Sequence, residues 1–421
     1  MKHSASHGGD ARRAVTVSSL CIASYLVSYI LRNLLAVYNP QMIAGGEFTE
    51  AMTAALSSVY MITYAIGQLV MGTVGDYVHP RSMVSIGLLA AGGAMLAFSV
   101  APVGWLTYLL YGLLGLSLSM LRGPIVRLIT GSCRLSHARL ANLFLSFAGF
   151  VGPLLAGLFV LWIPYRGTYA TVGALAIGMA ALFFLGESIL ERRGYIHLPA
   201  TPREGGATAS YRTLLREDKL WAYLLLAMTV EITTSSVHHW LTLYMTEVLS
   251  MTEGAAAMLY SVLSFVRAVS TFAVLPLFYL LRRREDRLLA LAFGVAGLLF
   301  FVMYLSPVRA LSVVCMLLAE ICTSVASAAV WSVYLPSLAE RGRVSGINGL
   351  MDAAGYFVAA LASLAFVPVA AAFSYGGLLL TWCAVCAVSV PIALCGYRRH
   401  AHASEPSTEN ETAENVNLSK Q

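Results

Sequence analysis

Twelve long apolar segments follow one another along the chain, and each is long enough for a helix to cross a lipid bilayer. They cover residues 14–37, 51–74, 82–101, 105–131, 138–162, 168–190, 220–247, 254–281, 287–306, 309–338, 344–368 and 374–397. The hydrocarbon core of a bilayer is roughly 30 Å thick, which a helix of about 20 residues spans. Only 11% of the residues are charged, against about 25% in ordinary soluble domains. The sequence therefore predicts an all-α membrane protein with twelve transmembrane helices.

The basic residues lie mostly on one side of the membrane that these segments define. Most of the 27 Lys and Arg residues fall in the N-terminus, in every second loop and in the C-terminal tail, whereas only Arg166, in a loop, and Arg309, at the first position of its segment, lie on the other side. Loops rich in Lys and Arg stay in the cytoplasm. We therefore expect a multi-pass protein of the inner (plasma) membrane with both termini cytoplasmic. The same loops explain the net charge of +6, which thus does not indicate a nucleic-acid partner.

The longest loop divides the chain into two halves of six segments each. It covers residues 191–219, is basic, and contains Pro199, Pro202 and Gly205–Gly206, a composition typical of linkers. The predicted organisation is a cytoplasmic N-terminus (1–13), a six-helix bundle (14–190), a linker (191–219), a second six-helix bundle (220–397) and a disordered cytoplasmic tail (398–421). Two repeated bundles that face each other across a central cavity are typical of secondary transporters.

Ionisable residues inside the apolar segments follow a regular period. Away from the segment ends, these residues are Arg32, Arg122, Arg127, Glu231, His238, His239, Arg267, Glu320 and Asp352. Such residues cost about 2.5–3.5 kcal/mol each at the bilayer centre and usually face the protein interior. The third, sixth, ninth and twelfth segments carry no charge in their membrane-buried parts, so we expect these four helices to face lipid. A channel, a receptor or a respiratory subunit has no reason to show this period.

Arg32 is the first candidate for contact with a substrate. With Tyr25 and Tyr29 it lies on one face of the first helix, because the spacing is four and three residues. A guanidinium is always charged and its planar fork matches phosphate or carboxylate. The alternative is that Arg32 pairs with a carboxylate of another helix and only stabilises the fold.

Segments seven, ten and two supply further candidates. Glu231, with Thr234, Ser235 and His238 after it, can hold a proton or bind a cationic or hydroxylated group, and the alternative is a helix-packing cluster. Glu320 begins a stripe in segment ten with Ser324, Ser327 and Trp331. Tyr64 and Gln68 form a similar stripe in segment two. Such stripes line transporter cavities, although aromatic stripes also pack cores.

Three stretches of the chain resemble a known family. They are Tyr25, Tyr29, Arg32, Asn33 and Pro40 in the first segment, the loop from Met71–Gly72 through Gly75–Asp76 to His79–Pro80–Arg81, and Gly346, Asn348–Gly349 and Gly355–Tyr356 in the eleventh segment. The chain thus resembles a major facilitator superfamily transporter, and within it the organophosphate:phosphate antiporters such as the glycerol-3-phosphate and hexose-phosphate carriers. The resemblance implies two pseudo-symmetric six-helix bundles, alternating access and a monomer.

The resemblance also implies where substrate and gate residues lie. Phosphate carriers grip phosphate with one arginine each from helices 1 and 7; Arg32 occupies the first position, but the stretch Val230–Ser236 offers no second arginine. The family's helix 2 lysine falls on Gln68.

In the superfamily, the aspartate matching Asp76 stabilises the outward-facing state. We therefore expect a gate that involves Asp76, Arg81 and Arg127; the alternative for Asp76 is a solvated surface charge. Arg267 and Asp352 lie on gating helices, where a pair between segments eight and eleven would have a structural or gating role and would not bind substrate directly.

These observations predict a secondary active transporter for a small anionic metabolite, of organophosphate or carboxylate type. With Asp76 and Arg127 set aside, three arginines face three carboxylates, so protonating one carboxylate would let an anion enter, as in proton symport. The alternatives are a proton-coupled multidrug or cation exporter that uses Glu231 and Glu320, or a transporter-like sensor. Outside the helices there is no nucleophile–base set, phosphate loop or metal-ligand cluster. We therefore expect no enzyme, no cofactor and no metal, and we attribute Cys383 and Cys386 to packing.

Overall fold

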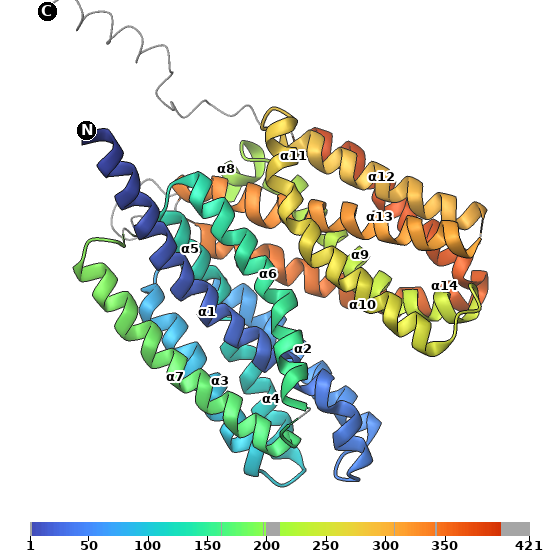
Figure 1. Ribbon diagram of the computed structural model, residues 1–421, viewed down its shortest axis with the longest axis horizontal. Coiled ribbons are helices and arrows are strands. Elements are labelled where there is room, and N and C mark those ends of the chain that lie inside the picture. The colour runs from blue at the N-terminus through green and yellow to red at the C-terminus, as the bar shows by residue number, and fades with distance from the viewer. Residues whose placement is uncertain are drawn as a thin grey trace, which may run out of the picture.

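The computed structural model describes residues 2–160, 162–196, 198, 211–306, 308–341 and 343–396, whose regular structure is helical (Figure 1). The first bundle contains α1 (Lys2–Ala44), α2 (Glu50–Val74), α3 (Pro80–Val100), α4 (Trp105–Leu118), α5 (Arg122–Ser132), α6 (Leu135–Val160) and α7 (Tyr165–Arg192), and α8 (Tyr211–Arg216) follows it. The second contains α9 (Leu220–Glu247), α10 (Glu253–Ser270), η1 (Thr271–Ala273), α11 (Val274–Leu280), α12 (Glu285–Leu305), α13 (Arg309–Ala328), η2 (Ala329–Tyr334), η3 (Leu335–Arg341) and α14 (Val344–Cys395).

The predicted fold class is confirmed. Within the described residues, 11 helical stretches are long and apolar enough to cross a membrane. Two of them, Val344–Ala362 and Ala372–Cys395, lie in α14, whose backbone leaves the helical conformation at Ser374 (φ 55°). The predicted seventh segment is α9, which is apolar over Leu220–Thr234, the part up to the first residues whose side chains lie outside the described ones. The structure is consistent with twelve transmembrane segments.

Three of the predicted segments are interrupted helices. The fourth segment is α4 and α5, separated at Ser119–Leu121, and the eighth is α10, η1 and α11. Pro124 and Pro276 lie in the first turns of α5 and α11, where a missing N–H costs no helical hydrogen bond. The tenth segment passes from α13 into a π-helix, η2. Such π-helical turns occur frequently at functional sites.

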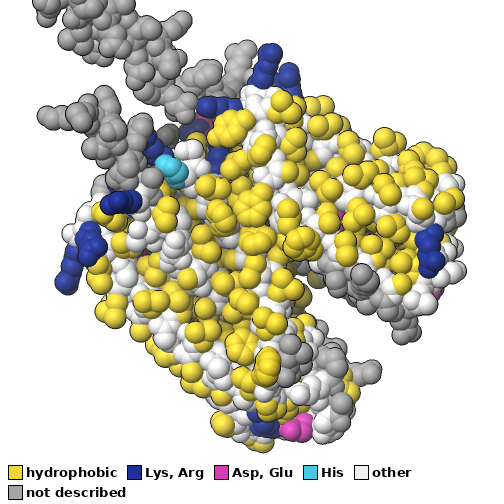
Figure 2. Space-filling model, in the orientation of Figure 1, with side chains coloured by type: hydrophobic (Ala, Val, Ile, Leu, Met, Phe, Trp, Pro, Cys, Tyr) yellow, Lys and Arg dark blue, Asp and Glu magenta, His cyan; other side chains and the backbone are white. Residues whose placement is uncertain are grey.

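Each bundle packs mainly within itself. In the first, α3 packs against α7, and α1 against α6 and α7; in the second, α9 and α12 pack against α14. Contacts between the bundles run from α2 and α5 to α14 and from α6 to η2. Figure 2 shows a notch between the bundles at one end of the molecule and apolar side chains over most of the visible surface.

The ends and the linker differ in part from the predicted boundaries. Helix α1 begins at Lys2 and continues without a break through residue 14, where the first bundle was predicted to begin. The predicted linker, 191–219, contains the short helix α8. Residues 199–210 and the predicted tail 398–421 lie outside the described residues, so the division of the chain into these domains stays a prediction.

Candidate functional site

A cavity of about 160 Å³ lies between the two bundles. Its charged lining residues are Arg122, Glu231, Arg267 and Asp352, and its aromatic ones are Tyr25, Tyr29, Phe150, Trp331 and Tyr356. Asn142, Ser146, Thr271, Ser324 and Ser327 supply neutral polar groups. The lining comes from α1, α5 and α6 on one side and from α9, α10, η1, α13, η2 and α14 on the other. A cavity with few charges, several rings and convergent polar groups is suited to a small molecule.

One ion pair in this cavity joins the two bundles. Arg122, the first residue of α5, lies 3.3 Å from the Asp352 carboxylate on α14. Asn348 donates a hydrogen bond to the other carboxylate oxygen of Asp352, at 3.1 Å. The Arg122 guanidinium also lies 4.3 Å from the centre of the Trp331 ring on η2. Arg122 therefore contacts two elements of the opposite bundle.

A second ion pair lies within the second bundle. The Arg267 guanidinium is 3.7 Å from the Glu320 carboxylate and donates a 2.7 Å hydrogen bond to Thr234. The pair of Arg267 with Asp352 that the sequence suggested is therefore wrong. Asp352 pairs with Arg122 instead, because α5 packs against α14 and brings Arg122 to it. Glu320 lies beside Arg267 and does not line the large cavity.

Arg32 lies in a cage formed by the rings of Tyr29, Tyr60, Tyr64 and Tyr356, which we call the tyrosine cage. Its guanidinium carbon is 5.1 Å from the centre of the Tyr64 ring and 5.2 Å from that of Tyr356. No carboxylate among the described residues forms an ion pair with Arg32. Arg32 is outside the cavity lining, but Tyr29 and Tyr356 belong to both the cage and the lining. The cage thus places an arginine without an ionic partner beside the cavity.

Glu231 lines the cavity from the opposite bundle. Among the described residues, no side chain or backbone group donates a hydrogen bond to its carboxylate. The charged groups that act on it are Asp352, which repels it, and Arg267, Arg122 and Arg32, which attract it. Its side chain passes close to Gly355, where an added Cβ would lie 2.5 Å from the Glu231 Cγ. Because Gly355 has no side chain, there is room beside it for the side chain of Glu231.

The other predicted substrate residues divide between the cavity and its surroundings. Tyr25 and Tyr29 line the cavity. Tyr64 faces Arg32, and Gln68, fully buried, donates a 2.7 Å hydrogen bond to the Tyr64 hydroxyl. Neither of these two residues lines the cavity. The side chain of His238 lies outside the described residues.

At the end opposite the notch, α2 and α14 close the space between the bundles; we call this the closed end. The Asp76 carboxylate accepts hydrogen bonds from the backbone N–H groups of Ser345 and Gly346, each 3.0 Å long, in the first turn of α14. Burial raises the pKa of Asp76 to about 6, although the amides and Arg127 act in the opposite direction. An aspartate of one bundle thus caps a helix of the other, and the alternative of a solvated surface charge does not hold.

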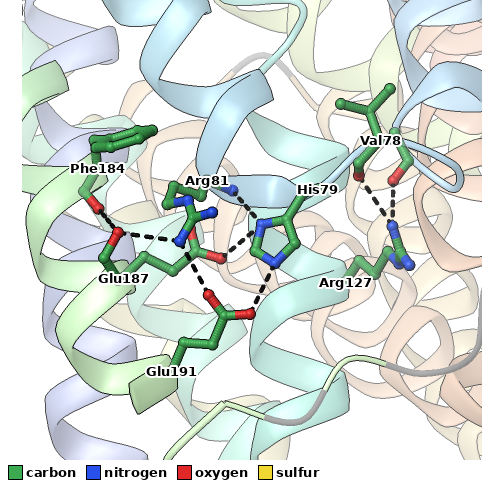
Figure 3. A network of polar contacts seen from close by, with 9 residues as sticks. Val78, His79, Arg81, Arg127, Phe184, Glu187 and Glu191 are labelled. Atoms are coloured by element: carbon green, nitrogen blue, oxygen red, sulfur yellow. Dashed lines mark hydrogen bonds and ion pairs between the residues drawn. The ribbon is translucent and has the colours of Figure 1, made fainter. Parts of the chain in front are cut away.

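Close backbone contact accompanies this cap. A Cβ added to Gly72 on α2 would lie 2.7 Å from the Cα of Gly349 on α14. Arg127 donates hydrogen bonds to the carbonyl oxygens of Gly75 and Val78, at 2.9 and 3.2 Å (Figure 3). These bonds hold the loop that carries Asp76, so Arg127 positions the aspartate through the loop.

Arg81, our third predicted gate residue, contacts its own bundle. It forms an ion pair with Glu191 on α7 at 3.0 Å, and His79 lies between Glu191 and Glu187 (Figure 3). Burial lowers the pKa of His79, although Glu191 acts in the opposite direction. Glu187, near the end of the sixth segment, is fully buried in the protein. These contacts join α3 to α7 and do not support a gating role for Arg81.

The sequence did not identify every residue of the cavity. Arg122 was recognised as an intramembrane charge but was not assigned to the site, and Asn142, Ser146 and Phe150 were not singled out. The signal for Arg122 was available, because it directly precedes Gly123–Pro124, which starts a new helix inside a membrane segment. Interrupted helices of this kind line transporter binding sites.

Comparisons with known proteins agree on the fold. The family model for the Major Facilitator Superfamily matches residues 21–360. A bacterial homologue of the iron transporter ferroportin, in its outward-facing state, is similar with a TM-score of 0.71 and 13% identity, over 90% of this chain and 99% of that one. The transporter FucP in its outward conformation is similar with a TM-score of 0.70 and 14% identity, over 92% and 100%. No curated protein matches this chain.

Proposed function

We propose, from the premise that this chain belongs to the Major Facilitator Superfamily and is a membrane transporter, that it moves a small anionic metabolite by alternating access. The observation that carries this proposal is Arg32. It is an arginine within a transmembrane helix that forms no ion pair among the described residues and lies beside the cavity. A charge in such a place is costly unless an anion compensates it.

The surroundings of Arg32 also favour an anion as cargo. The four rings of the tyrosine cage hold the guanidinium without using its N–H donors in an ion pair. Its planar fork is therefore available to a carboxylate or phosphate oxygen pair. Arg122 can also bind an anion, because its one hydrogen bond among the described residues is that to Asp352 and its other N–H donors stay available.

Alternating access is supported by the contacts of the closed end. Asp76, Gly72 and the start of α14 bring the bundles together there, whereas the notch lies at the other end (Figure 2). In the same view the Lys and Arg side chains gather toward the closed end, which the positive-inside rule assigns to the cytoplasm. The proposed state is thus outward-facing in an inner membrane, and the Asp76 cap is one side of a two-state equilibrium.

One observation favours a second candidate function. Glu231 is a carboxylate without a donor among the described residues and lines the cavity. A proton-coupled exporter of lipophilic cations would use such a group to bind cargo and proton in turn. This candidate predicts that Glu231, and not Arg32, controls binding.

The experiment is ligand-induced thermal stabilisation of the detergent-purified protein. A ligand at about 100 times its Kd adds roughly 2.7 kcal/mol to the free energy of unfolding. The panel contains phosphate, sugar phosphates, carboxylates, amino acids and lipophilic cations. We expect stabilisation by a member that carries an anionic group, its loss in Arg32→Gln, and partial recovery in Arg32→Lys, which keeps the charge. Stabilisation by cations alone, unaffected in Arg32→Gln and lost in Glu231→Gln, would replace our proposal with the exporter. A ligand that stabilises without being transported into vesicles would indicate a sensor.

A further inference from the structure

Among the described residues beside the cavity, Arg32 and Glu231 are the two charged side chains that form no ion pair. They carry opposite charges and belong to different bundles. We infer that the cargo is a small zwitterion, whose carboxylate binds Arg32 on α1 and whose protonated amine binds Glu231 on α9. This inference rests on the proposed function, because it takes the anion site at Arg32 as given and adds a second recognition point.

The ion pairs of the interior leave one charge of each sign without a partner among the described residues. Arg122 pairs with Asp352 and Arg267 pairs with Glu320, at 3.3 and 3.7 Å. One positive and one negative group are then left, and neither forms an ion pair among the described residues. A simple anion bound at Arg32 would leave the Glu231 charge uncompensated in a region of low dielectric constant, where such a charge is costly. A cargo with one charge of each sign compensates both.

Arg32 and Glu231 both lie beside the same turn of α14. The ring of Tyr356 lies 5.2 Å from the guanidinium carbon of Arg32. Its neighbour in the chain, Gly355, lies against the side chain of Glu231. Tyr356 also lines the cavity, together with Glu231. A molecule small enough for a cavity of about 160 Å³ can therefore approach both charges.

The rings around the cavity suit a protonated amine. Tyr25, Tyr29, Trp331 and Tyr356 all line it, and aromatic faces attract an ammonium group. The ligand would join α1 to α9, that is, one bundle to the other. Binding at both groups therefore favours a state in which the bundles lie close, which is how a cargo drives alternating access.

The test compares each amino acid with its two halves. Alanine, leucine and phenylalanine are each titrated beside the deaminated acid and the decarboxylated amine, by isothermal calorimetry in two buffers that differ in ionisation enthalpy. We expect one amino acid to bind at least tenfold more tightly than its acid and its amine, with no net proton uptake. In Glu231→Gln this preference over the acid should disappear while the acid binds as before.

Gly355→Ala tests the geometry separately, because its Cβ would displace the Glu231 side chain. We expect it to reduce the preference for the amino acid at least tenfold, whereas Gly178→Ala, whose Cβ meets nothing within 4 Å, should leave it unchanged. An unchanged preference in Glu231→Gln would overturn the inference, whatever Gly355→Ala does.

The other outcomes separate the inference from the function on which it rests. Binding of the acid as tightly as the amino acid, with uptake of about one proton, would overturn the zwitterion and leave the anion site at Arg32 intact; Glu231 would then carry the proton. Binding of the amine alone, unaffected in Arg32→Gln, would overturn both. Absence of binding by every member of the panel would also overturn both.

Discussion

Replacing Asp76 by alanine should shift the transporter strongly toward the state in which the closed end is open. The carboxylate accepts two 3.0 Å hydrogen bonds from the amides of Ser345 and Gly346. Without it both donors stay buried and unsatisfied, and each costs about 1–3 kcal/mol. Once the end opens, water satisfies the amides and this cost disappears. A total of about 3 kcal/mol changes the ratio of the two states roughly a hundredfold.

Asp76→Asn should act less strongly, because its amide oxygen can still accept one of the two bonds. It also removes a buried charge, and the pKa of Asp76 shows that this charge is unfavourable in the closed state. Burial raises that pKa to about 6 from an ordinary value of 3.8, whereas in the open state we expect the ordinary value. Asp76 therefore binds a proton more tightly when the closed end is closed than when it is open. Lowering the pH from about 8 to about 5 should raise the ratio of the closed to the open state of this end by about tenfold in the wild type and not in Asp76→Asn.

The assay measures the distance between two spin labels at the notched end. Trp162 and Val308 are exposed residues of opposite bundles there, and cysteines at these positions, in a background without the seven native cysteines, carry the labels. The wild type should show mainly long distances, and Asp76→Ala mainly short ones. Equal distance distributions in the wild type and in Asp76→Ala would refute the reasoning, as would a wild-type shift toward short distances at low pH.

Two further substitutions test the contacts between the bundles. Gly349→Ala should shift the same label distance toward short values, because its Cβ would collide with Gly72 across the closed end. Gly178→Ala serves as the control. An unchanged distance distribution in Gly349→Ala would contradict the close contact between the backbones of α2 and α14. Arg122→Gln leaves Asp352, only 3% exposed, without its ionic partner, so the free energy of unfolding should fall by about 3–5 kcal/mol. The double variant Arg122→Gln, Asp352→Asn should recover most of this lost stability, as measured by thermal unfolding. If Arg122→Gln alone were as stable as the wild type, the Arg122–Asp352 pair would not be buried.

The sequence predicted the fold from the length and spacing of its apolar segments, because a bilayer admits few alternatives to helices. It did not predict the breaks in the fourth, eighth and tenth segments. The apolar pattern continues through Ser119–Leu121 and through the π-helical turn at Ala329–Tyr334, so only Pro124 and Pro276 hinted at interruptions. Hydrophobic periodicity indicates which face of a helix is buried. It does not indicate where the backbone hydrogen bonds of the helix are interrupted.

The candidate site was predictable in its residue types but not in its pairings. Intramembrane charges had to face the interior, which pointed to Arg32, Glu231, Arg267 and Asp352. Which arginine meets which carboxylate depends on the relative height and rotation of α5, α10, α13 and α14, and these follow from packing between segments far apart in the chain. For this reason the pair of Arg267 with Asp352 that the sequence suggested is wrong. The tyrosine cage around Arg32 has the same origin, since its rings come from three different helices.

The dependence of transport on Arg32 is tested most directly by uptake of radiolabelled amino acids and carboxylates into vesicles that contain the purified transporter, with Arg32→Gln and Arg32→Lys measured in parallel. We expect uptake of a solute with an anionic group, at least tenfold slower in Arg32→Gln at equal protein incorporation and partly restored in Arg32→Lys. Uptake at the wild-type rate in Arg32→Gln would rule out an anion site at Arg32, because the cargo would then not depend on the one arginine beside the cavity that the described structure leaves without an anionic partner.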